Sequence, residues 1–174
     1  TTFLAWLVRR RGYIHHFCEL APGQEGIGPG LRNLAAQLAL AYKLIPDGVL
    51  PRAADRGDFL YELLKQAVSK LIDGEKIVLV VDALDEGGTP LHQNVLGLPQ
   101  SLPAGVYIIA SQRPQHVDLR VDTPLTPYFS YLLAAESDDN RGDMRRFLAN
   151  ASKWPGVNQT LQHSGYSPAQ FVAT

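Results

Sequence analysis

The sequence predicts an α/β fold, in which a parallel β-sheet is covered by helices on both faces. Its clearest element is an unbroken apolar run from Ile77 to Val81, where four of the five side chains are β-branched. A run of this kind, without polar alternation, is typical of a strand that is buried on both faces. A second apolar run follows at Val106 to Ala110, and amphipathic helical patterns precede the first. Helices that alternate with buried strands indicate the α/β class.

The first part of the chain predicts a helix, a strand and a loop. Apolar residues share one helical face over residues 1–11, and Gly12 suits the end of that helix. Residues 13–18 follow as a strand, in which His15 and His16 point to opposite faces and so do not share a metal. Residues 19–30 are rich in glycine and proline and are expected to form a loop. Their glycines match neither of the two common phosphate-binding spacings.

Two further helices are expected before the apolar run. A stripe of apolar residues predicts a helix from Leu31 to Ile45, ended by Pro46-Asp47-Gly48. The second helix begins near Asp55 or Asp58, either of which is a suitable first residue, and ends at Gly74.

Beyond the second apolar run, the sequence predicts one strand and two helices. Residues 128–133 are the best strand candidate. Asn140 is expected to cap a helix over residues 141–150. The segment Ser167-Pro168-Ala169-Gln170 is a capping box with proline at the first helical position, which predicts a last helix.

Composition limits the classes of function. The chain has 174 residues, 45% hydrophobic and 19% charged, as in a globular domain of ordinary size. A net charge of −1 and a pI of about 6.5 indicate neither nucleic acid nor a membrane surface as a partner. The single cysteine, Cys18, excludes an internal disulfide and fits a reducing compartment, so we expect a cytoplasmic location.

Three acids follow the first apolar run. Asp82 ends the expected strand, and Asp85 and Glu86 lie in the turn beyond it. Open α/β sheets bind ligands at the carboxyl ends of their strands. Acids gathered there repel one another unless a cation or a proton is bound, and carboxylate oxygens suit Mg²⁺. The simpler alternative is that Asp82 only caps the turn.

These motifs resemble those of a known family. Val81-Asp82-Ala83-Leu84-Asp85-Glu86 resembles the Walker B strand of P-loop NTPases, in the form found in the STAND class of signalling ATPases, with its NACHT-like and AAA-like members. Ser111-Gln112-Arg113-Pro114 is similar to the Thr/Ser-x-Arg-Pro sensor strand of that class, with Gln112 in place of the usual serine. Asp143-Met144-Arg145-Arg146-Phe147-Leu148 is similar to the helix that follows the sensor.

The resemblance implies a role for each site residue. Asp82 would hold Mg²⁺ through water, together with Thr1, and Asp85 or Glu86 would polarise the water that attacks the γ-phosphate. Arg113 would read that phosphate with its fork of donors. Thr1 or Thr2 looks like the threonine that closes a G-K-T-T sequence and would contact the nucleotide, ATP or GTP.

The resemblance also implies the organisation of the chain. Residues 1–136 would be an NTPase core that begins at or just after the Walker A motif and so lacks its first strand. Residues 137–174 would begin a helical extension. Residues 13–18, 76–82 and 106–111 would pair in parallel, with 76–82 in the middle of this P-loop NTPase-like, three-layer fold.

Three functions remain open. The first is a switch that binds and hydrolyses ATP or GTP, acts with other domains or subunits of a signalling assembly, and is inactive as this chain alone. The second is a degenerate scaffold for protein interactions that does not hydrolyse nucleotide. The third is a two-metal hydrolase or nuclease, which needs further acids such as Glu19 and Asp118.

Overall fold

The computed structural model describes residues 1–113, 119–120, 122, 126–132, 134 and 137–173. The chain divides into two compact units, Thr1–Tyr128 and Phe129–Thr174.

The first unit is built on a parallel sheet of three strands. These are β1 (Ile14–Phe17), β2 (Ile77–Asp82) and β3 (Val106–Ala110), in the order β1-β2-β3. In the register, Phe17 lies beside Asp82, and Val81 lies beside Ala110. The α/β class, the parallel pairing and the central position of the 76–82 strand are therefore as predicted.

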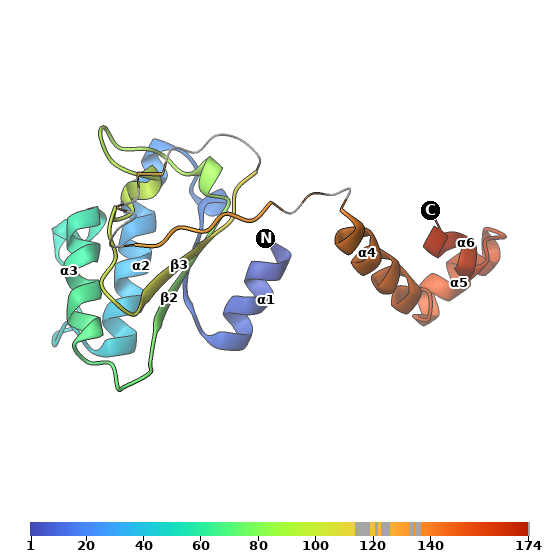
Figure 1. Cartoon of the computed structure of the whole chain (residues 1–174), viewed down its shortest axis with the longest axis horizontal. Coiled ribbons are helices and arrows are strands. Elements are labelled where there is room, and N and C mark those ends of the chain that lie inside the picture. Colours follow the sequence, from blue (N-terminus) through green and yellow to red (C-terminus); the bar gives the residue numbers. More distant parts are fainter. Residues whose placement is uncertain (114–118, 121, 123–125, 133, 135–136, 174) are drawn as a thin grey trace. The chain divides into compact units, whose positions relative to one another are not determined.

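Helices lie on both faces of this sheet (Figure 1). One face carries α2 (Ile27–Tyr42) and α3 (Gly57–Val68), and the other carries α1 (Thr2–Arg11). The core forms between the sheet and the α2–α3 pair, where Leu34, Leu38 and Leu64 are completely buried. By contrast, Leu4 is the buried residue of α1.

The two faces of β2 are separated by the alternation of its side chains. Ile77, Leu79 and Val81 belong to the core under α2 and α3. Val80 and Asp82 have the opposite parity and therefore face the side of the sheet that carries α1. This alternation aims the last carboxylate of the strand at the amino-terminal end of α1.

The loop expected over residues 19–30 is shorter than predicted. It contains two short 3-10 helices, Cys18–Leu20 and Gln24–Gly26, and α2 begins at Ile27. Pro29 fits there because the first turn of a helix does not use its N–H groups. Gly30 fits because a Cβ at that position would lie 2.9 Å from His16 Nε2. The glycines of this segment thus serve close packing as well as turns.

Both central helices end earlier than expected. Lys43 adopts a left-handed conformation with φ of 51°, which ends α2 at Tyr42 instead of Ile45. Asp55 belongs to a separate 3-10 turn, Arg52–Asp55, whereas Asp58 lies in the first turn of α3. That helix ends at Val68, well before Gly74, which adopts φ of +85° in the turn before β2.

The second unit contains α4 (Asp138–Ala151), α5 (Pro155–His163) and α6 (Pro168–Ala173). Ser137, and not Asn140, caps α4: its hydroxyl accepts the backbone N–H of Asn140 at 3.2 Å. The capping box of α6 is confirmed, because Ser167 and Gln170 each accept the other's backbone N–H. Helix α5 was not predicted from the sequence.

The strand expected over residues 128–133 is wrong for its described part. Residues 128–132 form no strand, and Leu133 lies outside the described residues. Tyr128, Phe129 and Tyr131 are exposed, and no described strand pairs with this segment.

Within the described part of the chain, no helix is both long enough and apolar enough to cross a bilayer.

Candidate functional site

The candidate site lies where β2 and β3 end. The ladder between these strands continues past β3, because the Ser111 N–H donates to the Val81 carbonyl at 3.0 Å. The Ser111 carbonyl in turn accepts a hydrogen bond from the Leu84 N–H at 2.8 Å. The segment after β3 is thereby fixed beside the acid-rich turn after β2.

Asp82 is the buried centre of the site, with an exposed fraction of 1%. Its Oδ1 accepts the Ser111 hydroxyl at 2.5 Å and lies 3.4 Å from the nitrogen of Thr1. Its Oδ2 is buried and has no hydrogen-bond partner among the described residues. One carboxylate oxygen is therefore held by the protein, and the other retains its full capacity to accept.

The carboxyl group of Asp82 is ionised at neutral pH. Burial tends to raise its pKa, and the hydrogen bonds from Ser111 and Thr1 lower it. A buried carboxylate with one open oxygen is suited to hold a cation or an ordered water.

A sharp turn brings the other two acids back to this edge. Ala83 adopts the left-handed conformation, with φ of 54°, which is uncommon for a residue other than glycine. The Ser111 hydroxyl accepts the Ala83 N–H at 3.1 Å and so helps to hold this conformation. The turn continues as a 3-10 helix, Leu84–Glu86, which carries Asp85 and Glu86.

Arg113 binds both of these acids. Its backbone N–H donates to Asp85 Oδ1 at 3.1 Å, and its Nε lies 3.0 Å from Asp85 Oδ2. Its Nη2 also pairs with Glu86 Oε1. The exposed fractions of the side chains differ: 4% for Asp85, 27% for Glu86 and 59% for Arg113.

The structure thus brings together most of the residues singled out from the sequence. Asp82, Asp85, Glu86 and Arg113 lie at one edge of the sheet, and Thr1 lies beside Asp82. Thr2 is the exposed first residue of α1.

Two residues of this region were not assigned a part in the site from sequence. Ser111 was noted only as part of a motif, although its parity with Tyr107 and Ile109 places it on the same face as Asp82. Cys18 is fully buried, and its thiol pKa is raised to about 11 by burial and by the charges of Asp82 and Asp85. Cys18 lies near Asp82 and Asp85 because of the register between β1 and β2, which could not be predicted from the sequence.

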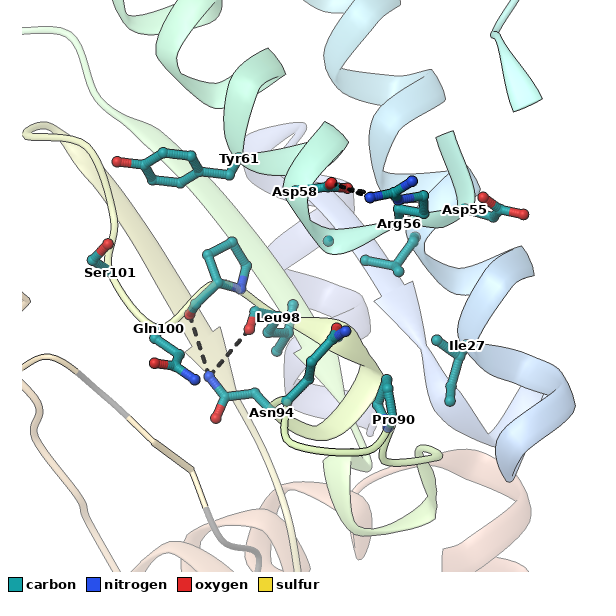
Figure 2. A pocket seen from close by; sticks show the side chains of 15 residues that line it. Ile27, Asp55, Arg56, Asp58, Tyr61, Pro90, Asn94, Leu98, Gln100 and Ser101 are labelled. Carbon is teal, nitrogen blue, oxygen red and sulfur yellow. Dashed lines mark hydrogen bonds and ion pairs between the residues drawn. The ribbon is translucent and has the colours of Figure 1, made fainter. Parts of the chain in front are cut away.

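A pocket of about 480 Å³ lies elsewhere, between the amino-terminal ends of α2 and α3 and the loop over residues 90–101 (Figure 2). Its described lining includes none of the predicted site residues. Its buried polar residue, Asn94, uses its amide nitrogen on the carbonyls of Leu98 and Pro99 and its amide oxygen on the Arg120 N–H. Asn94 therefore holds the loop together and directs no free polar group at a ligand.

The described residues contain no group of three or more histidine, cysteine or acidic side chains arranged to hold a metal. Glu19, one of the two further acids that a two-metal site would need, lies exposed in the first 3-10 helix. Asp118, the other, lies outside the described residues.

Comparison with known proteins finds no family model, no curated protein and no solved structure that matches this chain.

Proposed function

We propose that this chain is part of a magnesium-dependent nucleotide switch of the STAND type, which binds and hydrolyses ATP or GTP in the cytoplasm. One observation carries the proposal: a buried carboxylate with an open oxygen, two further acids and an arginine meet at the carboxyl edge of a parallel sheet. Ligands of open α/β sheets bind at this edge. The sequence resemblance supplies the class of ligand.

The residues present fit a magnesium ion. Asp82 offers its unpartnered Oδ2, and the hydroxyl of Thr1 is near the same carboxylate. Mg²⁺ is usually held by one or two carboxylates, with water and phosphate oxygens completing its shell, so a cluster of three protein acids is not required. When bound, the ion would neutralise charge on the β- and γ-phosphates.

The geometry favours different roles for the two acids that the sequence left as alternatives. Asp85 is nearly buried and is held by the backbone and the side chain of Arg113, which suits an anchor. Glu86 is more exposed and makes a contact with the outer end of the arginine. We therefore assign to Glu86 the task of accepting a proton from the attacking water, and to Asp85 that of positioning Arg113.

The protein-interaction scaffold remains the second candidate. The observation that favours it is that Arg113 already occupies the two acids, as it would if these residues only stabilised the turn. A scaffold would keep this pairing and have no use for the open oxygen of Asp82.

Nucleotide binding by the protein with Asp82→Asn distinguishes the two candidates. A labelled ATP analogue is titrated into the full-length protein that contains this chain, with and without Mg²⁺. If Asp82 holds the ion, the affinity of the variant for the nucleotide in the presence of Mg²⁺ is lower than that of the wild type by about tenfold or more. Loss of residues that support a metal site has an effect of this size. Asp73→Asn is the matched control, because Asp73 is exposed in the turn at the opposite end of β2. An unchanged affinity in Asp82→Asn would leave the scaffold as the better candidate.

A further inference from the structure

The arginine that the switch would use to read phosphate is already bound to the acid that would activate water. Arg113 and Glu86 form a direct ion pair, so Arg113 Nη2 and Glu86 Oε1 are engaged with each other in this arrangement. An arginine donates hydrogen bonds and accepts none. A terminal phosphate that binds Arg113 Nη2 must therefore compete with Glu86 for this nitrogen.

The contacts of Arg113 with Asp85 and Glu86 differ in number and in exposure to solvent, and this difference decides which contact can break. Its inner part is fixed at two points by Asp85, through the backbone N–H and Nε. Its outer nitrogen pairs with Glu86, whose side chain is about a quarter exposed, at 27%. An exposed pair is weak because water screens it. The outer contact can thus break while Asp85 keeps the arginine at the sheet edge.

We propose that Arg113 is a latch: it holds Glu86 inactive until the terminal phosphate of a nucleoside triphosphate displaces that carboxylate. This inference rests on the proposed function and adds its regulation. A triphosphate carries the additional anionic group that reaches the outer nitrogen of Arg113, whereas a diphosphate does not and leaves the latch closed. Binding of the correct nucleotide and release of the base are then one event.

The latch has a consequence for affinity. Because Glu86 competes with the terminal phosphate, removal of its charge strengthens triphosphate binding. Glu86→Gln therefore binds Mg-ATP more tightly than the wild-type protein, by about two- to fivefold, the range for release of one exposed ion pair. It binds Mg-ADP with unchanged affinity, and it hydrolyses ATP more slowly because the base is lost.

The test is a double-mutant cycle, with the affinities of Mg-ATP and Mg-ADP measured for wild type, Glu86→Gln, Arg113→Ala and the double variant. The gain of Glu86→Gln is expected to disappear in the Arg113→Ala background. Glu62→Gln is the matched control, because it removes the same charge from an exposed ion pair with Lys65 on α3. This control should change neither affinity.

The Arg113 Nε–H signal in the nuclear magnetic resonance spectrum gives a direct readout. We expect it to shift in Glu86→Gln and on addition of Mg-ATP, but not of Mg-ADP, to wild type. A protein that binds both nucleotides, with equal affinities in wild type and Glu86→Gln and an unmoved Arg113 signal, would overturn the latch alone. If the full-length protein binds neither nucleotide, the proposed function and the latch are overturned together.

Discussion

The two carboxylate oxygens of Asp82 have different surroundings, and this difference determines which oxygen can bind a ligand. Oδ1 is committed to Ser111, and Oδ2 is buried and open. The sequence predicts the carboxylate at the strand end, because an apolar run stops there. It does not predict which hydroxyl binds it, since that depends on the β2–β3 register across about 30 residues of chain.

His16 is a second buried polar residue, and it makes stability depend on pH. Its exposed fraction is 6%, and burial, with a smaller effect from His15, lowers its pKa below 6.5. Between that lowered value and 6.5 the unfolded chain binds a proton that the folded chain does not. The contribution of His16 to the free energy of unfolding is therefore present above pH 6.5 and is lost as the pH falls.

Chemical denaturation at about pH 7.5 and about pH 5.5, on either side of the ordinary histidine pKa, measures this loss. We expect His16→Gln to remove most of the difference in unfolding free energy between the two conditions. His15→Gln is the control, because His15 is only partly buried and its ring contacts the Tyr13 carbonyl. An equal pH dependence in wild type and His16→Gln would show that other groups cause it.

At the scale of elements, the strands were easier to predict than the helix boundaries. The apolar run of β2 is buried between layers, as its composition predicts, whereas β3 buries Val106 but exposes Tyr107 and Ile109. The start of α2 was misplaced because Gly28, Pro29 and Gly30 favour a loop when read locally. Tertiary contacts decide otherwise: Gly30 is where α2 packs against His16 and Leu96. Helix propensity is a weak prior when packing opposes it.

A similar close approach fixes the start of α3. A Cβ on Gly57 would lie 2.1 Å from the Gly97 carbonyl oxygen, which is backbone and cannot rotate away. Gly57→Ala must therefore push α3 away from the loop that contains Gly97. We expect a loss of about 1–3 kcal/mol in the free energy of unfolding, the usual cost of overpacking.

Gly28→Ala is the control for this prediction, measured by the same denaturant unfolding. Its Cβ would meet only Asp55 Cβ at 3.4 Å, an ordinary contact. Alanine is a better helix former than glycine by up to about 1 kcal/mol, so this variant should be unchanged or more stable. Equal losses in the two variants would mean that the contact with Gly97 does not decide the position of α3.

At the scale of the whole molecule, the first unit leaves the outer edge of β3 without a described partner strand. β2 pairs with β1 and β3, but no described strand pairs with the outer side of β3. Tyr107 and Ile109 are exposed there, and Phe3 and Trp6 of α1 are also exposed. Neither the composition nor the apolar run of β3 shows how many strands flank it.

The open edge leads to a prediction about association. Unpaired N–H and C=O groups beside exposed apolar side chains form pairs with other chains. We expect the chain to self-associate with rising concentration, as measured by sedimentation velocity. Ile109→Lys places a charge on this edge and should weaken the association by about tenfold or more, equivalent to ~1.4 kcal/mol.

Val49→Lys is the matched control for that change. Val49 is an exposed apolar residue of the same unit, with an exposed fraction of 69% against 38% for Ile109, and it lies in the loop between α2 and α3. If exposed apolar area alone drives association, Val49→Lys should weaken it at least as much as Ile109→Lys. If the edge of β3 drives it, Val49→Lys should associate as the wild type does. Equal association of Ile109→Lys and wild type would show that copies of the chain do not meet through β3.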